Sequence, residues 1–377
     1  MAKSKTKTAR LMVAASEIDA DMLYATNFWA PDPFIFLQKN GKRTLVLSDL
    51  EIDRGRKQAK ADEFVPFSKL EKEVQGRSKK APSYEKVLVH FLRKRGVKSA
   101  LVPASFALGY AEELRSNAIK VHATNGSFWP QREAKSGKEV AFIEQALRIT
   151  ETGLKRAIEV LKASRPGPSK KLKWAGETLT SEALRAEIDS AILRAGGIPN
   201  GTIVAGGDQA CDPHNRGSGP LYAGSLIILD VFPRDSKSGY FGDLTRTVLR
   251  GRASEAQKKL WATVKAGQSL ALKRIRAGVD GMTIHKAIQD FFTANGYATG
   301  VRQGRQVGFF HGTGHGLGLE IHEYPRLQKV VLKERQVVTV EPGLYYPGLG
   351  GVRLEDVVVV TKRGCDILSR FPKQLEI

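Results

Sequence analysis

Apolar and polar positions in the first third of the chain alternate in a way that predicts a mixed α/β unit. Two strand-like runs, Phe34–Gln38 and Arg43–Ser48, flank Asn40-Gly41, a pair typical of a two-residue hairpin turn. Apolar residues at helical spacing predict a helix over Tyr84–Arg95, and Ser99–Pro103 is typical of another short strand. We expect this unit to span residues 1–125.

The remaining residues, 126–377, have longer helical patterns separated by β-rich stretches. Helices are predicted up to Ser164, from the cap residue Thr180 to Gly196-Gly197, over Ser254–Ala277, and from Thr283 to before Gly296. A loop is expected at the Pro/Gly cluster 165–169. Strands are predicted at Ser225–Val231, Thr245–Leu249, Gln336–Glu341 and Val352–Thr361. Strands that interrupt paired helices favour an α+β domain over a doubly wound parallel sheet.

The composition excludes several classes of protein. Of the 377 residues, 41% are hydrophobic and 26% charged, as in globular proteins. The chain has no apolar run near the roughly 18 residues that cross a bilayer, and Leu11–Ala15 is too short for a signal core, so we expect a first strand there. Only Cys211 and Cys365 occur, which indicates neither a disulfide framework nor a cysteine zinc site. These features favour the cytoplasm.

The net charge of +21 raises the question of nucleic-acid binding. The basic residues are scattered in short groups, at 3–10, 77–80, 93–95 and 170–173, and no zinc finger or RNA-binding aromatic motif accompanies them. A solvated cationic surface is the interpretation we favour, and a binding scaffold for nucleic acid or acidic proteins is the alternative.

Two aspartates lie at the mouth of a predicted hairpin. Asp230 closes an apolar strand and Asp243 opens the next, with turn residues between them. Carboxylates buried together on paired strands repel each other, at a cost of several kcal/mol unless a cation neutralises them. The pair is therefore either exposed in a turn or buried around a cation.

Two glutamates frame a second predicted hairpin. Glu341 ends the strand VVTVE, and Glu355 lies in the run GVRLEDVVVV. Period-two alternation places Arg353 and Glu355 on one face of that run. A surface Arg–Glu pair is the simplest alternative, but the valine-rich context favours burial.

Three histidines, His311, His315 and His322, lie in the stretch HGTGHGLGLEIHEYPR. The spacing of the first two is that of a zinc-binding HExxH helix, but Gly312 stands where the glutamate is needed, and the frequent glycines disfavour a helix. We expect an irregular strand whose glycines allow close approach to a ligand. Buried histidines satisfied by hydrogen bonds are the alternative interpretation.

Together these stretches supply two Asp, two Glu and an imidazole as candidate metal ligands. The charge of four carboxylates matches that of two divalent ions, and oxygen-rich ligation suits Mn²⁺ or a similar ion. Two neighbouring metals can activate a shared water and polarise a carbonyl, so hydrolysis is the chemistry that the set indicates.

In these residues the sequence resembles the pita-bread metallopeptidases (family M24), which include prolidase, aminopeptidase P, methionine aminopeptidase and the metal-free creatinase. The motifs are ILDVFPRDSKSGYFGDLTRT, HGTGHGLGLEIHEYPR and TVEPGLYYPGLGGVRLED. The resemblance covers nearly the whole chain and is most specific from 203 to 361. It implies a pita-bread catalytic domain over 126–377, preceded by a smaller creatinase-type α/β domain over 1–125.

The resemblance also implies roles for individual residues. The metal ligands it implies are Asp230, Asp243, His315, Glu341 and Glu355. The residues it implies for substrate binding are His214, His311, His322, Arg326 and Arg353, and those for catalysis are Glu341, His214 and His322. Asp230 and Asp243 lie slightly further apart in the chain than the matching pair in relatives, which predicts a longer loop around 235–238.

The activity that the resemblance implies is cleavage of the peptide bond before proline, with two divalent ions, Mn favoured and Co or Zn as alternatives. Arg326, which matches a position that binds the substrate carboxylate, favours Xaa-Pro dipeptides over the longer peptides of an Xaa-Pro aminopeptidase. A catalytically silent scaffold of the same fold is a further alternative. Relatives of this kind are often homodimers, and we expect the same here.

Overall fold

The computed structural model describes residues 8–377, so most of the basic group at 3–10 lies outside the described residues. The chain divides into two compact units, the first ending at Arg132 and the second beginning at Glu133. The division falls later than the boundary expected between 125 and 126, because Phe128 and Trp129 pack into the core of the first unit. No helix in the described part of the chain is both long and apolar enough to cross a bilayer.

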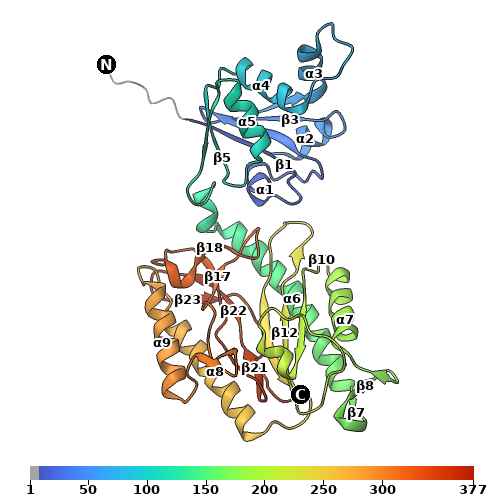
Figure 1. Cartoon of the computed structure of the whole chain (residues 1–377), viewed down its shortest axis with the longest axis vertical. Helices are drawn as coiled ribbons and strands as arrows, with labels where there is room; N and C mark the ends of the chain where they lie inside the picture. The colour runs from blue at the N-terminus through green and yellow to red at the C-terminus, as the bar shows by residue number, and fades with distance from the viewer. Residues whose placement is uncertain (1–7) are drawn as a thin grey trace. The chain divides into compact units, whose positions relative to one another are not determined.

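The first unit is built on a six-stranded mixed sheet with the strand order β4-β3-β2-β1-β5-β6 (Figure 1). Its strands are β1 (Ala9–Ala14), β2 (Phe34–Lys39), β3 (Lys42–Leu47), β4 (Glu63–Pro66), β5 (Ser99–Val102) and β6 (Lys120–Ala123). Its helices are α1 (Ala20–Thr26), α2 (Ile52–Gln58), α3 (Phe67–Gln75), α4 (Tyr84–Lys94) and α5 (Leu108–Ser116). Asn40 and Gly41 join β2 to β3 with φ of 51° and 85°, which confirms the predicted hairpin.

The second unit contains four long helices, α6 (Gly137–Ala163), α7 (Ser181–Arg194), α8 (Glu255–Arg274) and α9 (Gly281–Ala294). Ser136 and Ser254 form capping boxes at the starts of α6 and α8, and Thr180 caps α7 as predicted. The fourth helix begins before the predicted Thr283, because the side chain of Asp280 accepts the Met282 N–H at 3.0 Å.

Two sheets and a hairpin carry the rest of the second unit. The three-stranded sheet contains β11 (Ile203–Gly206), β12 (Leu226–Val231) and β14 (Leu244–Leu249). The five-stranded sheet contains β18 (Glu323–Arg326), β17 (His315–Gly316), β19 (Val337–Val340), β22 (Asp356–Val360) and β23 (Cys365–Ile367), and the hairpin contains β20 (Gly343–Tyr346) and β21 (Gly350–Arg353). Helix α6 packs against α7 and α8 against α9, on opposite flanks of these strands in Figure 1. The expected α+β class is confirmed.

Short strands complete the second unit. They are β7 (Arg165–Pro166), β8 (Leu172–Trp174), β9 (Glu177–Thr178), β10 (Gly197–Ile198), β13 (Arg234–Asp235), β15 (Gly300–Arg302) and β16 (Arg305–Val307). The Pro/Gly cluster after α6, expected to be a loop, therefore begins with a strand that pairs with β8.

The strand predicted over Val352–Thr361 is wrong as a continuous element. β21 pairs with β20, β22 pairs with β19, and the chain breaks between them at Leu354 and Glu355. The break arises because the Glu355 N–H leaves the strand pairing and donates to the carbonyl of Thr245 at 3.1 Å. This break places Glu355 between the two sheets.

Candidate metal centre and active site

Five potential metal ligands come from five places on the strands of the second unit. Asp230 is in β12, Asp243 directly precedes β14, His315 is in β17, Glu341 directly follows β19, and Glu355 lies between β21 and β22. Asp230 pairs with Thr245 across β12 and β14, so Asp243 lies on the same face as Asp230. All five line one cavity. The acids of the two predicted hairpins and the histidine stretch therefore meet in this cavity.

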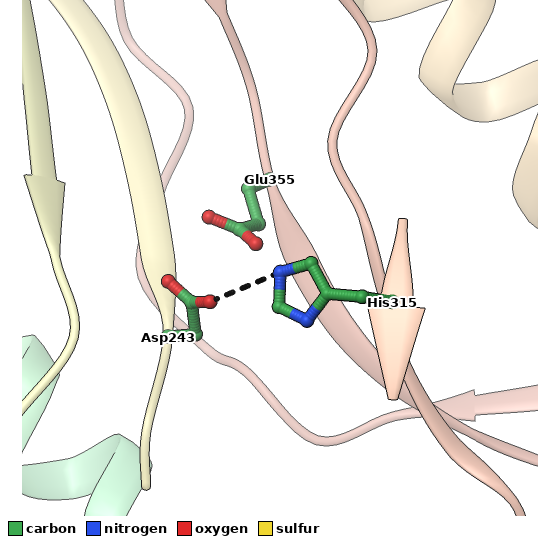
Figure 2. A group of neighbouring side chains, drawn as sticks. All are labelled: Asp243, His315 and Glu355. Carbon is green, nitrogen blue, oxygen red and sulfur yellow. Dashed lines mark ion pairs between the residues drawn. The ribbon is translucent and has the colours of Figure 1, made fainter. Parts of the chain in front are cut away.

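Asp243, His315 and Glu355 form the tightest group, and Figure 2 shows their polar ends pointing toward one another. Each offers a ligand atom within 4.8 Å of the others, and all three are buried. Nε2 of His315 lies 3.6 Å from Oδ2 of Asp243 and 3.4 Å from Oε1 of Glu341. These separations are longer than ordinary hydrogen bonds, and the group is one that could hold a metal ion.

His315 is oriented by the backbone around it. Its Nδ1 lies 3.1 Å from the carbonyl of Gly316, which can only accept, so the proton is on Nδ1 and the lone pair of Nε2 faces the acids. The His315 N–H donates to Oγ1 of Thr339 at 3.0 Å, which ties the residue to β19. Burial and His322 lower the pKa of His315 to about 3, so the ring is neutral and available as a ligand.

The surroundings of Asp243, Glu355 and Glu341 favour the protonated form of each side chain. Burial, followed by the neighbouring Glu355, Asp230 and Glu341, raises the pKa of Asp243 well above its usual range. Burial, then Glu341 and Asp230, raises the pKa of Glu355 in the same direction. Burial raises the pKa of Glu341 to about 7, although Arg353 opposes the shift. Bound cations would reverse these shifts, because they stabilise the ionised acids.

The carboxylate oxygens themselves fit a metal centre. Arg353 Nη2 donates to Oδ2 of Asp230 at 2.7 Å, and Thr245 Oγ1 donates to Oε2 of Glu355 at 2.8 Å. The second oxygens, Asp230 Oδ1 and Glu355 Oε1, are buried and have no hydrogen-bond partner among the described residues. Each carboxylate is thus oriented through one oxygen and presents the other, as expected for ligands of divalent ions.

The surrounding cavity has a volume of about 650 Å³. It brings the predicted substrate-binding residues to the same place, namely His214, His311, His322, Arg326 and Arg353. Its apolar wall contains Ile203, Phe232, Phe310 and Ile321, which the sequence analysis did not single out. The side chains of His214, His322 and Arg326 form no hydrogen bond with other described residues. Their polar atoms are therefore available to a substrate.

His311 differs from the other predicted substrate-binding residues because the protein uses both of its ring nitrogens. Nδ1 lies 2.8 Å from the carbonyl of Gly312, and Nε2 lies 2.8 Å from the Tyr345 hydroxyl. Nδ1 therefore donates, Nε2 accepts from Tyr345, and the hydroxyl accepts from Nη1 of Arg353 at 3.1 Å. Burial lowers the pKa of His311 to about 3. Tyr345 links His311 to Arg353, and its residue type alone gave no signal of this role.

The glycines around His315 were expected to allow close approach of a ligand, but two of them mainly admit neighbouring backbone. A Cβ on Gly314 would lie 1.9 Å from the carbonyl oxygen of Thr339, and one on Gly316 would lie 2.3 Å from that of Tyr324. The cavity does reach Gly312 and Gly314. The stretch is glycine-rich because three chain segments converge there.

The long loop expected between the two aspartates is present as a turn. Asp235 Oδ2 accepts the Ser238 N–H at 3.1 Å, and β13 pairs with β10. Pairing of β12 with β14 extends to Val231 and Leu244, so the longer loop leaves the strand register intact.

The fold and the chemistry of the cavity define a metallopeptidase. Residues 141–362 match the model of metallopeptidase family M24, and the chain belongs to this family. An Xaa-Pro dipeptidase of Pyrococcus horikoshii is 28% identical over 338 residues, which cover 88% of this chain and 85% of that protein.

Solved structures share the whole fold. The X-Pro aminopeptidase of Thermotoga maritima matches with a TM-score of 0.81 at 24% identity, covering 98% of this chain and 97% of that one. The prolidase of Pyrococcus furiosus matches with a TM-score of 0.78 at 23% identity, covering 97% of each chain. The fold with its additional N-terminal unit is therefore that of prolidases and X-Pro aminopeptidases, as the sequence predicted.

Proposed function

We propose that this protein hydrolyses Xaa-Pro dipeptides with two divalent metal ions, Mn²⁺ being the favoured ion. The observation that carries the proposal is the convergence of Asp230, Asp243, His315, Glu341 and Glu355 in one cavity that also contains His322 and Arg326. The similarity to an Xaa-Pro dipeptidase over most of both chains supports the same substrate class.

The available side chains suit a short peptide with a free carboxylate. Arg326 would bind that carboxylate, since its guanidinium can form two parallel hydrogen bonds with it. Burial and Arg326 lower the pKa of His322, so its ring is neutral. The N–H of this neutral ring would donate to the carbonyl before proline. Phe232 and Phe310 would contact the apolar parts of the peptide. Recognition of proline needs no amide N–H at the scissile bond.

The chemistry divides between the metals and the chain. Divalent ions held by the five ligands would supply a water of lowered pKa and polarise the scissile carbonyl. Glu341 would accept the proton that this water releases and return it to the proline nitrogen, which must be protonated to leave. His214 would assist in moving the proton.

Metal analysis of the purified protein, followed by activity on Ala-Pro with Mn²⁺, Co²⁺ or Zn²⁺ added back, tests the proposal. Replacement of Asp243 by Ala should abolish both metal binding and turnover, because it removes a ligand at the centre of the group. Asp189→Ala is a suitable control, since Asp189 lies in α7 and accepts from Thr202 at 2.6 Å. Substantial turnover by the Asp243 variant would overturn the assignment.

A comparison of Ala-Pro with Ala-Pro-Gly-Gly separates the dipeptidase from the aminopeptidase alternative. Higher kcat/KM for the dipeptide is expected if Arg326 binds the proline carboxylate. Higher kcat/KM for the tetrapeptide would identify the protein as an Xaa-Pro aminopeptidase and leave the metal chemistry unchanged.

A further inference from the structure

Lys135 and Glu323 form an ion pair inside the second unit, with Nζ of Lys135 donating to Oε1 of Glu323. Their side chains are only 2% and 6% exposed. A buried ion pair adds little net stability, because the desolvation of both charges offsets their attraction. The position of the pair in the fold is therefore more informative than its energy.

The backbone that carries Lys135 is fixed to two elements of the second unit. The Lys135 N–H donates to the carbonyl of Arg335 at 2.8 Å, and Nε of Arg335 donates back to the carbonyl of Lys135 at 2.6 Å. Arg335 lies just before β19, the strand that leads to Glu341. The next residue, Ser136, begins the capping box of α6. The ammonium group thus projects from a backbone that is tied both to the segment before β19 and to the start of α6.

Glu323 lies at the other end of the ion pair, in a segment that carries two candidate substrate-binding residues. It directly follows His322 and begins β18, which ends at Arg326. A Cβ on Gly318 would lie 2.6 Å from Oε1 of Glu323, so the carboxylate is packed beneath the loop between β17 and β18. Its Oε2 also accepts the Glu320 N–H at 3.4 Å. The carboxylate therefore lies against this loop at Gly318 and at Glu320.

We propose that Lys135 is a positioning residue that, through Glu323, fixes the segment 317–326 and so places His322 and Arg326 against the substrate. The inference rests on the proposed function, which gives those two side chains their contacts with the peptide. The described residues form no hydrogen bond with either side chain. The ring of His322 packs edge-on against that of His315, and the backbone sets the rest of their placement. An anchored backbone removes part of the entropy cost of arranging catalytic groups.

None of the five proposed metal ligands lies in this segment, and His315, which pairs with Arg326 and contacts the ring of His322, has a second support in β19. His315 is held to β19 by Thr339, and Leu317 N–H donates to the carbonyl of Val337 at 3.2 Å. The four carboxylates lie on other strands or at their ends. A change at Lys135 should therefore lower substrate turnover and leave metal binding unchanged. General unfolding would lower both.

The test uses the double variant Lys135→Met with Glu323→Leu, which removes both charges and so avoids leaving one of them buried without a partner. We expect a folded protein with the Mn²⁺ affinity of the wild type, and a loss in kcat/KM for Ala-Pro of about tenfold or more. Hydrogen–deuterium exchange should be faster in residues 317–326. The matched control is Arg156→Met with Glu187→Leu, which removes an α6–α7 pair joined at 2.6 Å and should leave both readouts unchanged.

Wild-type kcat/KM in the double variant, or a loss of Mn²⁺ binding in parallel with turnover, would overturn the inference. If the double variant does not fold, Glu323→Gln, which weakens the pair, replaces it with the same criteria. If the wild-type protein cleaves no Xaa-Pro peptide, the proposed function fails, and the exchange experiment then decides alone. Unchanged exchange in 317–326 would then reject the anchor, and faster exchange there but not in the control would support it.

Discussion

Arg353 donates from Nη2 to Oδ2 of Asp230 at 2.7 Å, and both side chains are buried. The guanidinium also donates to the hydroxyls of Tyr345 and Thr245 at 3.1 and 3.3 Å. It therefore offsets part of the charge of a cavity that contains four carboxylates. Burial acts to lower the pKa of Arg353, but Tyr345, Asp230 and Glu341 outweigh it and raise the pKa, so the guanidinium stays ionised.

Arg353→Met should strongly destabilise the metal-free protein, because it leaves Asp230 buried without its counter-charge. Loss of one partner of a buried ion pair costs about 3–5 kcal/mol of unfolding free energy. Added Mn²⁺ should restore part of that stability, because it compensates the charge of Asp230. Urea unfolding in EDTA and in Mn²⁺ measures both effects. Arg156→Met, which breaks a half-exposed pair, should cost no more than about 1 kcal/mol. Equal unfolding free energies for the two variants would contradict the assigned role of Arg353.

Thr245→Val should weaken metal binding with little change in volume. The hydroxyl donates to Oε2 of Glu355 at 2.8 Å and so orients its other, unpaired oxygen. Loss of such an orienting hydrogen bond lowers metal affinity by about 10–100-fold, which titration calorimetry with Mn²⁺ can measure. Thr202→Val, which removes a hydrogen bond to Asp189, serves as the control. Wild-type affinity in the Thr245 variant would mean that Glu355 is not oriented through this oxygen.

The stabilisation that Mn²⁺ confers should increase with pH. The raised pKa values of Asp243, Glu355 and Glu341 mean that these acids stabilise the metal-free fold at low pH, a contribution lost as pH rises through their folded values, about 7 for Glu341. Metal binding needs the ionised acids, so it must displace protons below that range. Melting temperatures with Mn²⁺ and with EDTA, at about pH 5.5 and 7.5, provide the measurement.

The informative quantity is the difference between the two melting temperatures at each pH. His311 and His315 have lowered pKa values, so their protonation in the unfolded chain removes stability as pH falls below about 6.5. That effect opposes the effect of the acids in the metal-free protein, but it cancels in the difference because His315 is neutral with or without metal. An equal difference at both pH values would show that the acids are ionised before the metal binds.

The sequence was sufficient to predict those parts of the fold that local chemistry determines. Thr180 and Ser254 cap helices where polar residues precede apolar periodicity, and Asn40-Gly41 forms its turn. The candidate ligands could be selected because acids are unusual beside buried valine-rich strands. The proximity of Asp230 and Asp243 also follows from the strand register, since Asp230 pairs with Thr245.

Other parts of the site depend on long-range contacts that residue types do not reveal. Thr245 and Tyr345 act through hydroxyls that meet partners far away in the chain. The break in the strand before Asp356 could not be predicted, because it depends on the hydrogen bond from the Glu355 N–H to the distant carbonyl of Thr245. Lys135 looks like any other lysine of a strongly basic chain until the fold buries it against Glu323.

Gly314→Ala should be among the most damaging small substitutions in the second unit. Its Cβ would lie 1.9 Å from the carbonyl oxygen of Thr339, which belongs to the backbone of β19 and cannot move alone. Overpacking of this kind costs about 1–3 kcal/mol or more, and the shift should also displace His315. Gly109→Ala, at a helical position with open space around it, is the control. Urea unfolding measures the stability of each variant, and titration with Mn²⁺ measures its metal affinity. Equal values for the two variants would contradict the prediction.

Arg326→Met should affect dipeptides more than longer peptides. If the guanidinium binds the carboxylate of proline, its removal should raise KM for Ala-Pro, since one hydrogen-bonded ionic contact contributes about 1.5–3 kcal/mol. Ala-Pro-Gly-Gly carries its carboxylate two residues further on and should lose less. The metal content should stay at the wild-type value, because Arg326 lies on β18 and is not one of the five proposed ligands. An equal loss on both peptides would place Arg326 at the scissile bond rather than at the carboxylate, and an unchanged KM for Ala-Pro would remove the structural basis for preferring dipeptides.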